Sequence, residues 1–144
     1  MRVEDLLKAK GSAVHIIDPD QLVQDAAQDL AKANVGALVV SRDGRTIDGI
    51  LSERDIVRGY AKNGRDLSQL HVSDLMTRSV ITCCSSDQVS SVAHVMTSKR
   101  IRHIPVCIGN ELMGMVSIGD VLKSRIDEVQ LEANVLRDVA LASR

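Results

Sequence analysis

The sequence contains Gly49-Ile50-Leu51-Ser52-Glu53-Arg54-Asp55 and repeats its pattern at Gly114-Met115-Val116-Ser117-Ile118-Gly119-Asp120. Both copies read glycine, two apolar residues, serine, two variable residues and aspartate. Serine followed three residues later by an acidic residue is typical of a helix start, because the two side chains satisfy free N–H groups of the first turn. The pattern therefore predicts two strands that each run into a helix.

The segments before each serine predict a β-hairpin in each half of the chain. Short β-branched stretches at 35–40 and 101–106 are followed by turns at Arg42-Asp43-Gly44 and Gly109-Asn110. The expected partner strands are 47–51 and 112–116. Glycine and asparagine are the residues that tight hairpin turns favour.

Further upstream, each half predicts one short strand and one amphipathic helix. Residues 3–7 are echoed by 72–76, and the expected strands follow at 14–17 and 80–82. Asp18-Pro19 predicts a helix start in the first half, and Ser86 or Asp87 predicts one in the second. Apolar residues then recur at helical spacing, at Leu22, Val23, Ala26, Ala27 and Leu30 and at Val89, Val92, Ala93 and Met96.

This repetition divides the chain into a first repeat at 1–61, a polar linker at 62–71, a second repeat at 72–126 and a helical extension at 127–144. The last helix carries an apolar stripe in alternating steps of four and three, as a coiled-coil seam does. A stripe of that length needs a covering surface, so we expect it to fold back or to pair in a homodimer. Its members are Leu122, Ile126, Val129, Ala133, Leu136 and Ala140.

Composition narrows the class of protein. The chain has 144 residues, a formal net charge of −1, one tyrosine and no phenylalanine or tryptophan. Without aromatic stacking platforms or a basic stripe, we expect no nucleic-acid partner and no anionic membrane surface. No apolar run approaches the roughly 20 residues of a membrane span, so the expected location is the cytoplasm.

Cysteines and histidines give no metal or disulfide pattern. Cys83 and Cys84 are adjacent, and Cys107 stands alone, so no C-x-x-C motif is formed. His15, His71 and His94 lack metal-ligand spacing, and we assign no metal. A redox switch at Cys83-Cys84 is the less favoured alternative, since no cation stands beside the pair to activate a thiolate.

With both copies of the serine-aspartate pattern and the Ile101-Arg102-His103-Ile104-Pro105-Val106 strand, the chain resembles a tandem pair of cystathionine β-synthase (CBS) domains, or Bateman module. The resemblance covers about residues 1–126. It implies an α/β fold in which two β-α-β-β-α repeats pack through their sheets about a pseudo-twofold axis, followed here by a C-terminal helix. It also implies two clefts for adenosine-containing ligands.

The resemblance assigns roles to particular residues. Asp55 and Asp120 would accept hydrogen bonds from ribose hydroxyls, with Ser52 and Ser117 beside the sugar or phosphate. Helix capping explains the same four side chains without a ligand, and both roles can hold together. Adenine is expected at main-chain groups of the early strands, with aliphatic side chains on the ring, at Val14, His15, Ile16, Val80, Ile81, Thr82 and Pro105.

The phosphate candidates are Arg54, Arg100, Arg102 and His103. Guanidinium groups match phosphate oxygens in pairs, although each of these side chains could instead be a solvated surface charge. The second repeat has Arg102-His103 and Pro105 where the first has Gly36-Ala37 and Val39. Unequal sites follow, with the better phosphate contacts coming from the second repeat.

The leading hypothesis is a regulatory module without catalytic activity that binds AMP, ADP, ATP, NAD or NADH. No nucleophile with a neighbouring base, no phosphate-binding glycine loop and no metal cluster supports an enzyme. The alternative is an adaptor that keeps the fold and binds proteins without a ligand. A DNA-binding role ranks below both, because no basic recognition helix is evident. Any output partner is expected to be a separate protein.

Overall fold

Each serine of the repeated pattern ends a strand and begins a helix, as the sequence predicts. In the computed structural model, which describes residues 1–143, β3 (Gly49–Ser52) leads into α3 (Glu53–Asn63), and β5 (Glu111–Ser117) leads into α6 (Ile118–Ala142). The backbone N–H of Asp55 donates to Ser52 Oγ at 3.3 Å, and that of Asp120 donates to Ser117 Oγ at 3.1 Å. Each aspartate accepts in return from the serine N–H, at 2.9 and 2.8 Å. Both capping boxes are complete.

The two expected hairpins are present. β2 (Ala37–Val40) pairs antiparallel with β3, and β4 (His103–Ile108) pairs antiparallel with β5. The turn between β4 and β5 places Gly109 at a φ of +60°, a conformation that glycine adopts without strain. β1 (Ile16–Ile17) joins β2 in parallel, giving one sheet of three strands and one of two.

The strand predicted at 80–82 is wrong, and Pro105 explains why. In the first repeat, the N–H of Val39 donates to the carbonyl of His15 at 3.0 Å. The equivalent donor in the second repeat is Pro105, which has no N–H to offer the carbonyl of Ile81. Pairing resumes only at Cys83, whose carbonyl accepts from Cys107 N–H at 2.9 Å and which forms an isolated parallel bridge to Val106.

The predicted helix starts at Asp18-Pro19 and at Ser86 or Asp87 are also wrong. α2 begins at Val23 and α5 at Val89, and they end at Ala33 and Lys99. Main-chain carbonyls far away in the sequence take the place of cap side chains. The N–H of Val23 donates to the carbonyl of Leu70 at 2.8 Å, and that of Val89 donates to the carbonyl of Met1 at 3.0 Å.

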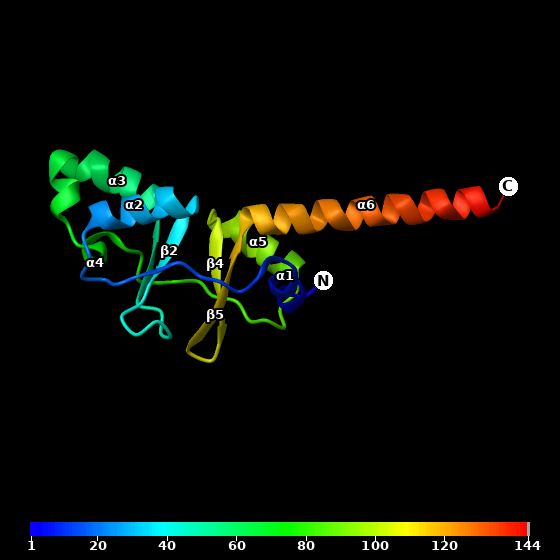
Figure 1. The fold of residues 1–144 in the computed structure, drawn as a ribbon, viewed down its shortest axis with the longest axis horizontal. Helices are drawn as coiled ribbons and strands as arrows, with labels where there is room; N and C mark the ends of the chain where they lie inside the picture. Colours follow the sequence, from blue (N-terminus) through cyan, green and yellow to red (C-terminus); the bar gives the residue numbers. More distant parts are fainter. Residues whose placement is uncertain (144) are drawn as a thin grey trace.

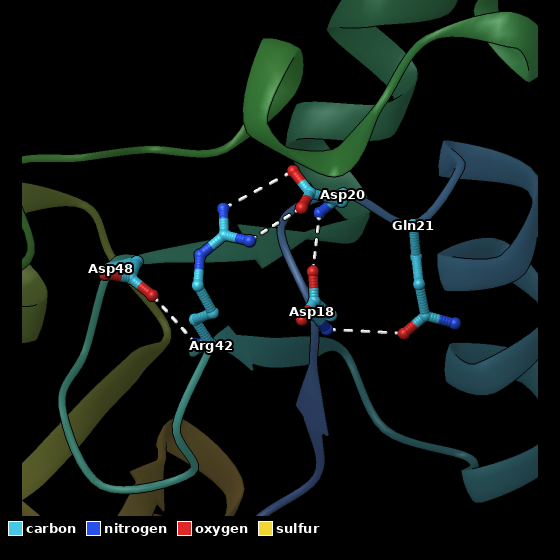
Figure 2. A network of polar contacts seen from close by, with 5 residues as sticks. All are labelled: Asp18, Asp20, Gln21, Arg42 and Asp48. Carbon is cyan, nitrogen blue, oxygen red and sulfur yellow. Dashed lines mark hydrogen bonds and ion pairs between the residues drawn. The ribbon is translucent and has the colours of Figure 1, made fainter.

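Asp18 instead shapes the turn that precedes α2. Its carboxylate accepts from the N–H of Asp20 at 2.8 Å, while its own N–H donates to Gln21 Oε1 at 3.3 Å. Figure 2 shows Asp20 beside Arg42, whose Nη1 lies 2.6 Å from Asp20 Oδ2, and Arg42 N–H donating to Asp48. The pair ties this turn to the loop between β2 and β3. Both side chains are exposed, so the contact adds little to stability.

The two short helices at the starts of the repeats are exchanged between two hydrophobic cores. α1 (Val3–Lys10) places Val3 and Leu6 in the core of the second repeat, with Ile104 and Val116. α4 (Val72–Leu75) places Val72 in the core of the first repeat, with Leu51. Each core therefore needs residues from both halves of the chain.

The final helix extends well beyond the rest of the molecule (Figure 1). Val121 and Ser124, near its start, are buried, whereas residues 129–143 are exposed. Residues 64–69, in the stretch predicted as a linker, form a 3-10 helix, η1 (Gly64–Gln69). The described chain thus has the predicted α/β architecture of two repeats and a C-terminal helix. Among residues 1–143, no helix combines the length and apolar character that a membrane crossing would require.

Candidate functional site

A cleft of about 500 Å³ lies where the start of α3 meets the second repeat, and we call it the Asp55 cleft. This volume is within the range of small-molecule sites. The first repeat contributes Ser52, Arg54 and Asp55, and the second contributes residues 79–81 and 99–103. The structure thus brings together eight of the residues singled out from the sequence: Ser52, Arg54, Asp55, Val80, Ile81, Arg100, Arg102 and His103.

The Asp55 cleft is strongly basic. Its lining includes five positive side chains and two carboxylates, which leaves an excess of positive charge for an anion. The charged residues are Arg54, Arg58, Lys99, Arg100 and Arg102 on the positive side and Glu53 and Asp55 on the negative side.

Local structure fixes several of these groups. Asp55 Oδ2 accepts from Ser52, and its Oδ1 accepts from the hydroxyl of Thr77 at 3.3 Å. Arg54 Nη1 donates to the carbonyl of Arg100 at 2.9 Å, which joins α3 to the end of α5. Arg100 ends α5 at a φ of 56°. The acidic and basic parts of the cleft are therefore held by contacts between the two repeats.

A second cleft of about 370 Å³ lies around Asp120 and is called the Asp120 cleft. It brings together Val14, His15, Ser117 and Asp120, and it shares His103 with the first cleft. The helix ends at Asn34 and Arg100 have matching left-handed conformations, which sets the correspondence between the repeats. By this correspondence, Asn34, Gly36 and Ala37 stand in the Asp120 cleft where Arg100, Arg102 and His103 stand in the other.

Lys10, at the end of α1, forms an ion pair with Asp120 in the Asp120 cleft. Its Nζ lies 2.6 Å from Asp120 Oδ2 and donates to the carbonyl of Met115 at 2.7 Å. Burial acts to raise the pKa of Asp120, but the hydrogen bonds from Lys10 and Ser117 outweigh it, and the pKa lies below its ordinary value. The charge of the Asp120 carboxylate is therefore balanced by the ammonium group of Lys10. Asp55 differs, because it accepts a hydrogen bond from the uncharged hydroxyl of Thr77.

His103 and Gly36 line both clefts and so form the wall between them. A Cβ on Gly36 would lie 2.8 Å from Glu53 Oε1 and 2.9 Å from His103 Cε1, so a larger residue there would force these two side chains to shift. Burial lowers the pKa of His103, opposed by the carboxylates of Glu53 and Asp120, while the cations of Arg102 and Lys10 lower it further.

The lowered pKa of His103 predicts a loss of stability as the solution is acidified. Between the folded-state pKa and the unfolded value of about 6.5, the unfolded chain binds more protons, so the unfolding free energy falls with falling pH. We expect His103→Gln to reduce the loss measured by urea denaturation between about pH 7.5 and about pH 5.5. His94→Gln, at an exposed histidine of α5, is the control. An unchanged pH dependence in His103→Gln would contradict this assignment.

Some predicted site residues lie elsewhere, and some site residues were missed. Within the described chain, Ile16, Thr82 and Pro105 line neither cleft. The contact of adenine with main-chain groups at Ile16 and Thr82 and with Pro105 stays a prediction from the sequence. None of the repeated sequence patterns marked six further lining residues: Lys10, Glu53, Arg58, Thr77, Ser79 and Lys99. Arg58 is one helical turn after Arg54, the spacing that could have identified it.

Burial disfavours the thiolate form of the two buried cysteines, Cys83 and Cys107. Burial raises the pKa of Cys83 to about 12, which disfavours a thiolate, and burial also raises the pKa of Cys107. Within residues 1–143, no three histidine, cysteine or acidic side chains are grouped so that they could hold a metal ion. The Asp55 cleft combines the carboxylates of Glu53 and Asp55 with five cationic side chains.

The architecture defines a class of protein: two pseudosymmetric repeats with interlocked cores and two clefts between them. Comparison with known proteins identifies a family with this architecture. The sequence profile of the CBS domain matches residues 3–62 and 72–127. The chain is 37% identical over 134 residues to the CBS domain-containing protein CBSX3, mitochondrial, of Arabidopsis thaliana, covering 88% of this chain and 65% of the relative. It therefore spans less than two thirds of that relative's length.

Solved structures show the same fold. The CBS-domain containing protein ATU1752 from Agrobacterium tumefaciens superposes with a TM-score of 0.84 at 39% identity, covering 87% of this chain and 99% of that one. The CBS domain protein PAE2072 from Pyrobaculum aerophilum, solved in complex with AMP, superposes with a TM-score of 0.73 at 31% identity and covers 83% and 89%. The chain belongs to the CBS-domain family and carries two CBS domains in tandem.

Proposed function

We propose that this chain is a regulatory module that binds one adenine nucleotide in the Asp55 cleft. The observation that carries the proposal is the combination, in one cleft, of a carboxylate with an excess of positive charge. A ribose needs hydrogen-bond acceptors for its hydroxyls, and a phosphate needs cationic donors. Asp55 supplies the first, and Arg100, Arg102 and Arg54 supply the second. The complex of PAE2072 with AMP supports this ligand class.

The adenine base is placed beside Val80 and Ile81. Pro105 cannot donate to the carbonyl of Ile81, so that acceptor stays available for the exocyclic amino group of adenine. Ile81 is 37% exposed, which leaves apolar surface for the ring. AMP would contact the groups named above for adenine, ribose and phosphate. The additional phosphates of ADP or ATP, or the second nucleotide half of NAD or NADH, would extend toward Arg58 and Lys99.

The proposed output is a shift in the packing of the two repeats, passed to a separate protein target rather than used in catalysis. Ligand contacts come from both repeats, so binding changes the free energy of their association. A cytoplasmic location stays a prediction from the sequence. The alternative is an adaptor that keeps this fold without a ligand, and it would be favoured by absent nucleotide affinity together with tight protein partners in a pull-down.

Isothermal titration of the purified chain with AMP, ADP, ATP, NAD, NADH and S-adenosylmethionine tests the proposal. We expect saturable binding of at least one nucleotide, with one molecule per chain and an affinity that weakens with added salt, because phosphate contacts are screened. Adenosine, which lacks the phosphate, should bind more weakly than AMP. No binding of any of these ligands would overturn the proposal, and steady turnover of a nucleotide would contradict the non-catalytic part.

We also propose that α6 pairs two copies of the chain. Its exposed stripe includes Leu122, Ile126, Val129 and Leu136, each at least 49% exposed, in the alternating spacing of a coiled-coil seam. An isolated helix is marginally stable in water, so this projecting segment gains its stability by covering the stripe.

The seam predicts that Leu136→Glu converts a dimer into a monomer. Leu136 is 70% exposed and lies far along α6, so a charge there cannot disturb the hydrophobic cores. It would place two like charges in the apolar seam of a pair. Sedimentation of the native chain should give a dimer and that of Leu136→Glu a monomer, with Arg137→Glu beside it as the charge control. A native monomer would remove this part of the proposal.

A further inference from the structure

The apolar seam of α6 faces away from the rest of the chain. Val121 and Ser124 are buried, whereas Leu122 and Ile126 of the seam are 57% and 66% exposed. Because successive residues of an α-helix lie about 100° apart around its axis, the seam is more than a quarter turn from the buried side. Beyond its first turns, α6 projects alone (Figure 1). A second helix can therefore lie along the seam without meeting the repeats.

A second apolar stripe lies on the other side of α6. Leu131 and Val135 are 65% and 52% exposed, and helical spacing places them in line with Val121 and Ser124. This stripe prolongs the side that α6 packs against its own chain, and it lies only in the second half of the helix. The seam runs the whole length of α6, so a full-length helix pair uses the seam.

Charged side chains flank the seam. Lys123 and Arg137 each follow a seam residue on one flank, and Glu132 precedes a seam residue on the other. Each is exposed, and no ion pair within residues 1–143 involves any of the three. Arg125 lies on the flank of Glu132, but it pairs with Glu128 of its own helix at 3.3 Å. Three charges beside the seam are thus available to a partner helix.

A parallel pair and an antiparallel pair bring different charges together. In a parallel pair, a side chain that precedes a seam residue faces the partner's side chain five residues later. Glu132 then faces the partner's Arg137, and symmetry repeats the contact. In an antiparallel pair of full length, each flank faces its own copy, so Glu132 opposes the partner's Glu132 and Lys123 opposes the partner's Arg137. Opposite charges attract in the first arrangement, and like charges repel in the second.

We propose that α6 pairs in parallel with α6 of a second copy, with Glu132 of each chain bound to the partner's Arg137. This inference rests on the pairing of α6 in the proposed function and adds its direction. A parallel pair holds the repeats of both copies at one end and brings the two copies of Ala140 into one layer. In an antiparallel pair, Ala140 would face the partner's Leu122, about 27 Å from its own copy at about 1.5 Å per residue.

Disulfide formation at Ala140 tests the direction. Cys84 is exposed, so every variant also carries Cys84→Ser. In a glutathione buffer, two introduced thiols pass two electrons and two protons to oxidised glutathione, which becomes two reduced molecules, and a disulfide forms if the Cα atoms are within about 7 Å. We expect Ala140→Cys to give linked dimers, at least about tenfold more than Asp138→Cys on the outer side of the pair.

Exchange of the flanking charges tests what sets the direction. In the same assay, Arg137→Glu should lower the equilibrium linking of Ala140→Cys about tenfold, because like charges then face each other twice. Adding Glu132→Arg should restore linking, since the charges are again opposite. Asp127→Lys, a charge reversal away from the seam, is the control and should leave linking unchanged. Linking that ignores the charges at 132 and 137 would overturn the proposed ion pairs.

The outcomes separate the direction from the pairing itself. A native chain that sediments as a monomer would overturn both. A native dimer in which Ala140→Cys links no more than Asp138→Cys, while mixed Leu122→Cys and Ala140→Cys chains link to each other, would overturn the direction and leave the pairing. Should Ala140→Cys disturb the helix, Leu136→Cys gives the same comparison, because an antiparallel pair holds its two copies about 15 Å apart.

Discussion

Replacing Asp55 with asparagine is expected to weaken AMP binding about tenfold to a hundredfold, since a hydrogen bond to a charged acceptor contributes about 1.5–3 kcal/mol and each 1.4 kcal/mol is a factor of ten. Asparagine keeps one side-chain oxygen, which can still accept from the N–H of Ser52 and preserve the helix start. The loss should therefore fall on the ligand and not on the fold. Isothermal titration measures it.

Asp120→Asn is the matched control, because Asp120 has the same position in the repeated pattern and the same capping role. In the native background it should leave AMP affinity within about twofold, a change of less than 0.5 kcal/mol by the same arithmetic. Thermal unfolding of both variants checks that the helix starts are equally affected. Equal loss of affinity in the two variants would contradict the assignment of AMP to the Asp55 cleft.

Leu51→Ala is expected to lower the free energy of unfolding by about 2–5 kcal/mol, the range for removing a buried leucine side chain. Leu51 is 0% exposed and packs in the core that Val72 of α4 completes. Because α1 and α4 are exchanged between the cores, the second repeat should unfold in the same transition. Urea denaturation followed by far-UV circular dichroism and by the fluorescence of Tyr60 should give coincident curves.

The control for this variant is Leu131→Ala, at a leucine of α6 that is 65% exposed. Surface substitutions of this kind change stability by less than about 0.5 kcal/mol. Two separated transitions in Leu51→Ala, with the dichroism of the second repeat unaffected, would show that the cores are independent and that the exchange of helices does not couple them.

Predictions from the sequence were most accurate where a pattern acts through neighbouring residues. The capping boxes at Ser52 and Ser117 join groups three residues apart, and each hairpin brings together consecutive strands. The same local reasoning failed at Asp18 and Asp87, where good cap residues precede the helices. There the carbonyls of Leu70 and Met1 satisfy the first N–H groups, and no local rule identifies so distant a partner.

The sequence by itself determined the twofold repetition, the helix starts at Ser52 and Ser117 and the cations that follow α5, because these depend on the types and spacing of adjacent residues. Only the tertiary structure decided that α1 and α4 exchange cores and that Lys10, rather than a hydroxyl, faces Asp120. Lys10 and Asp120 are 110 residues apart in the chain. Such a contact depends on the packing of whole elements, and a lysine in the last turn of a helix carries no local pattern that marks it as part of a cleft.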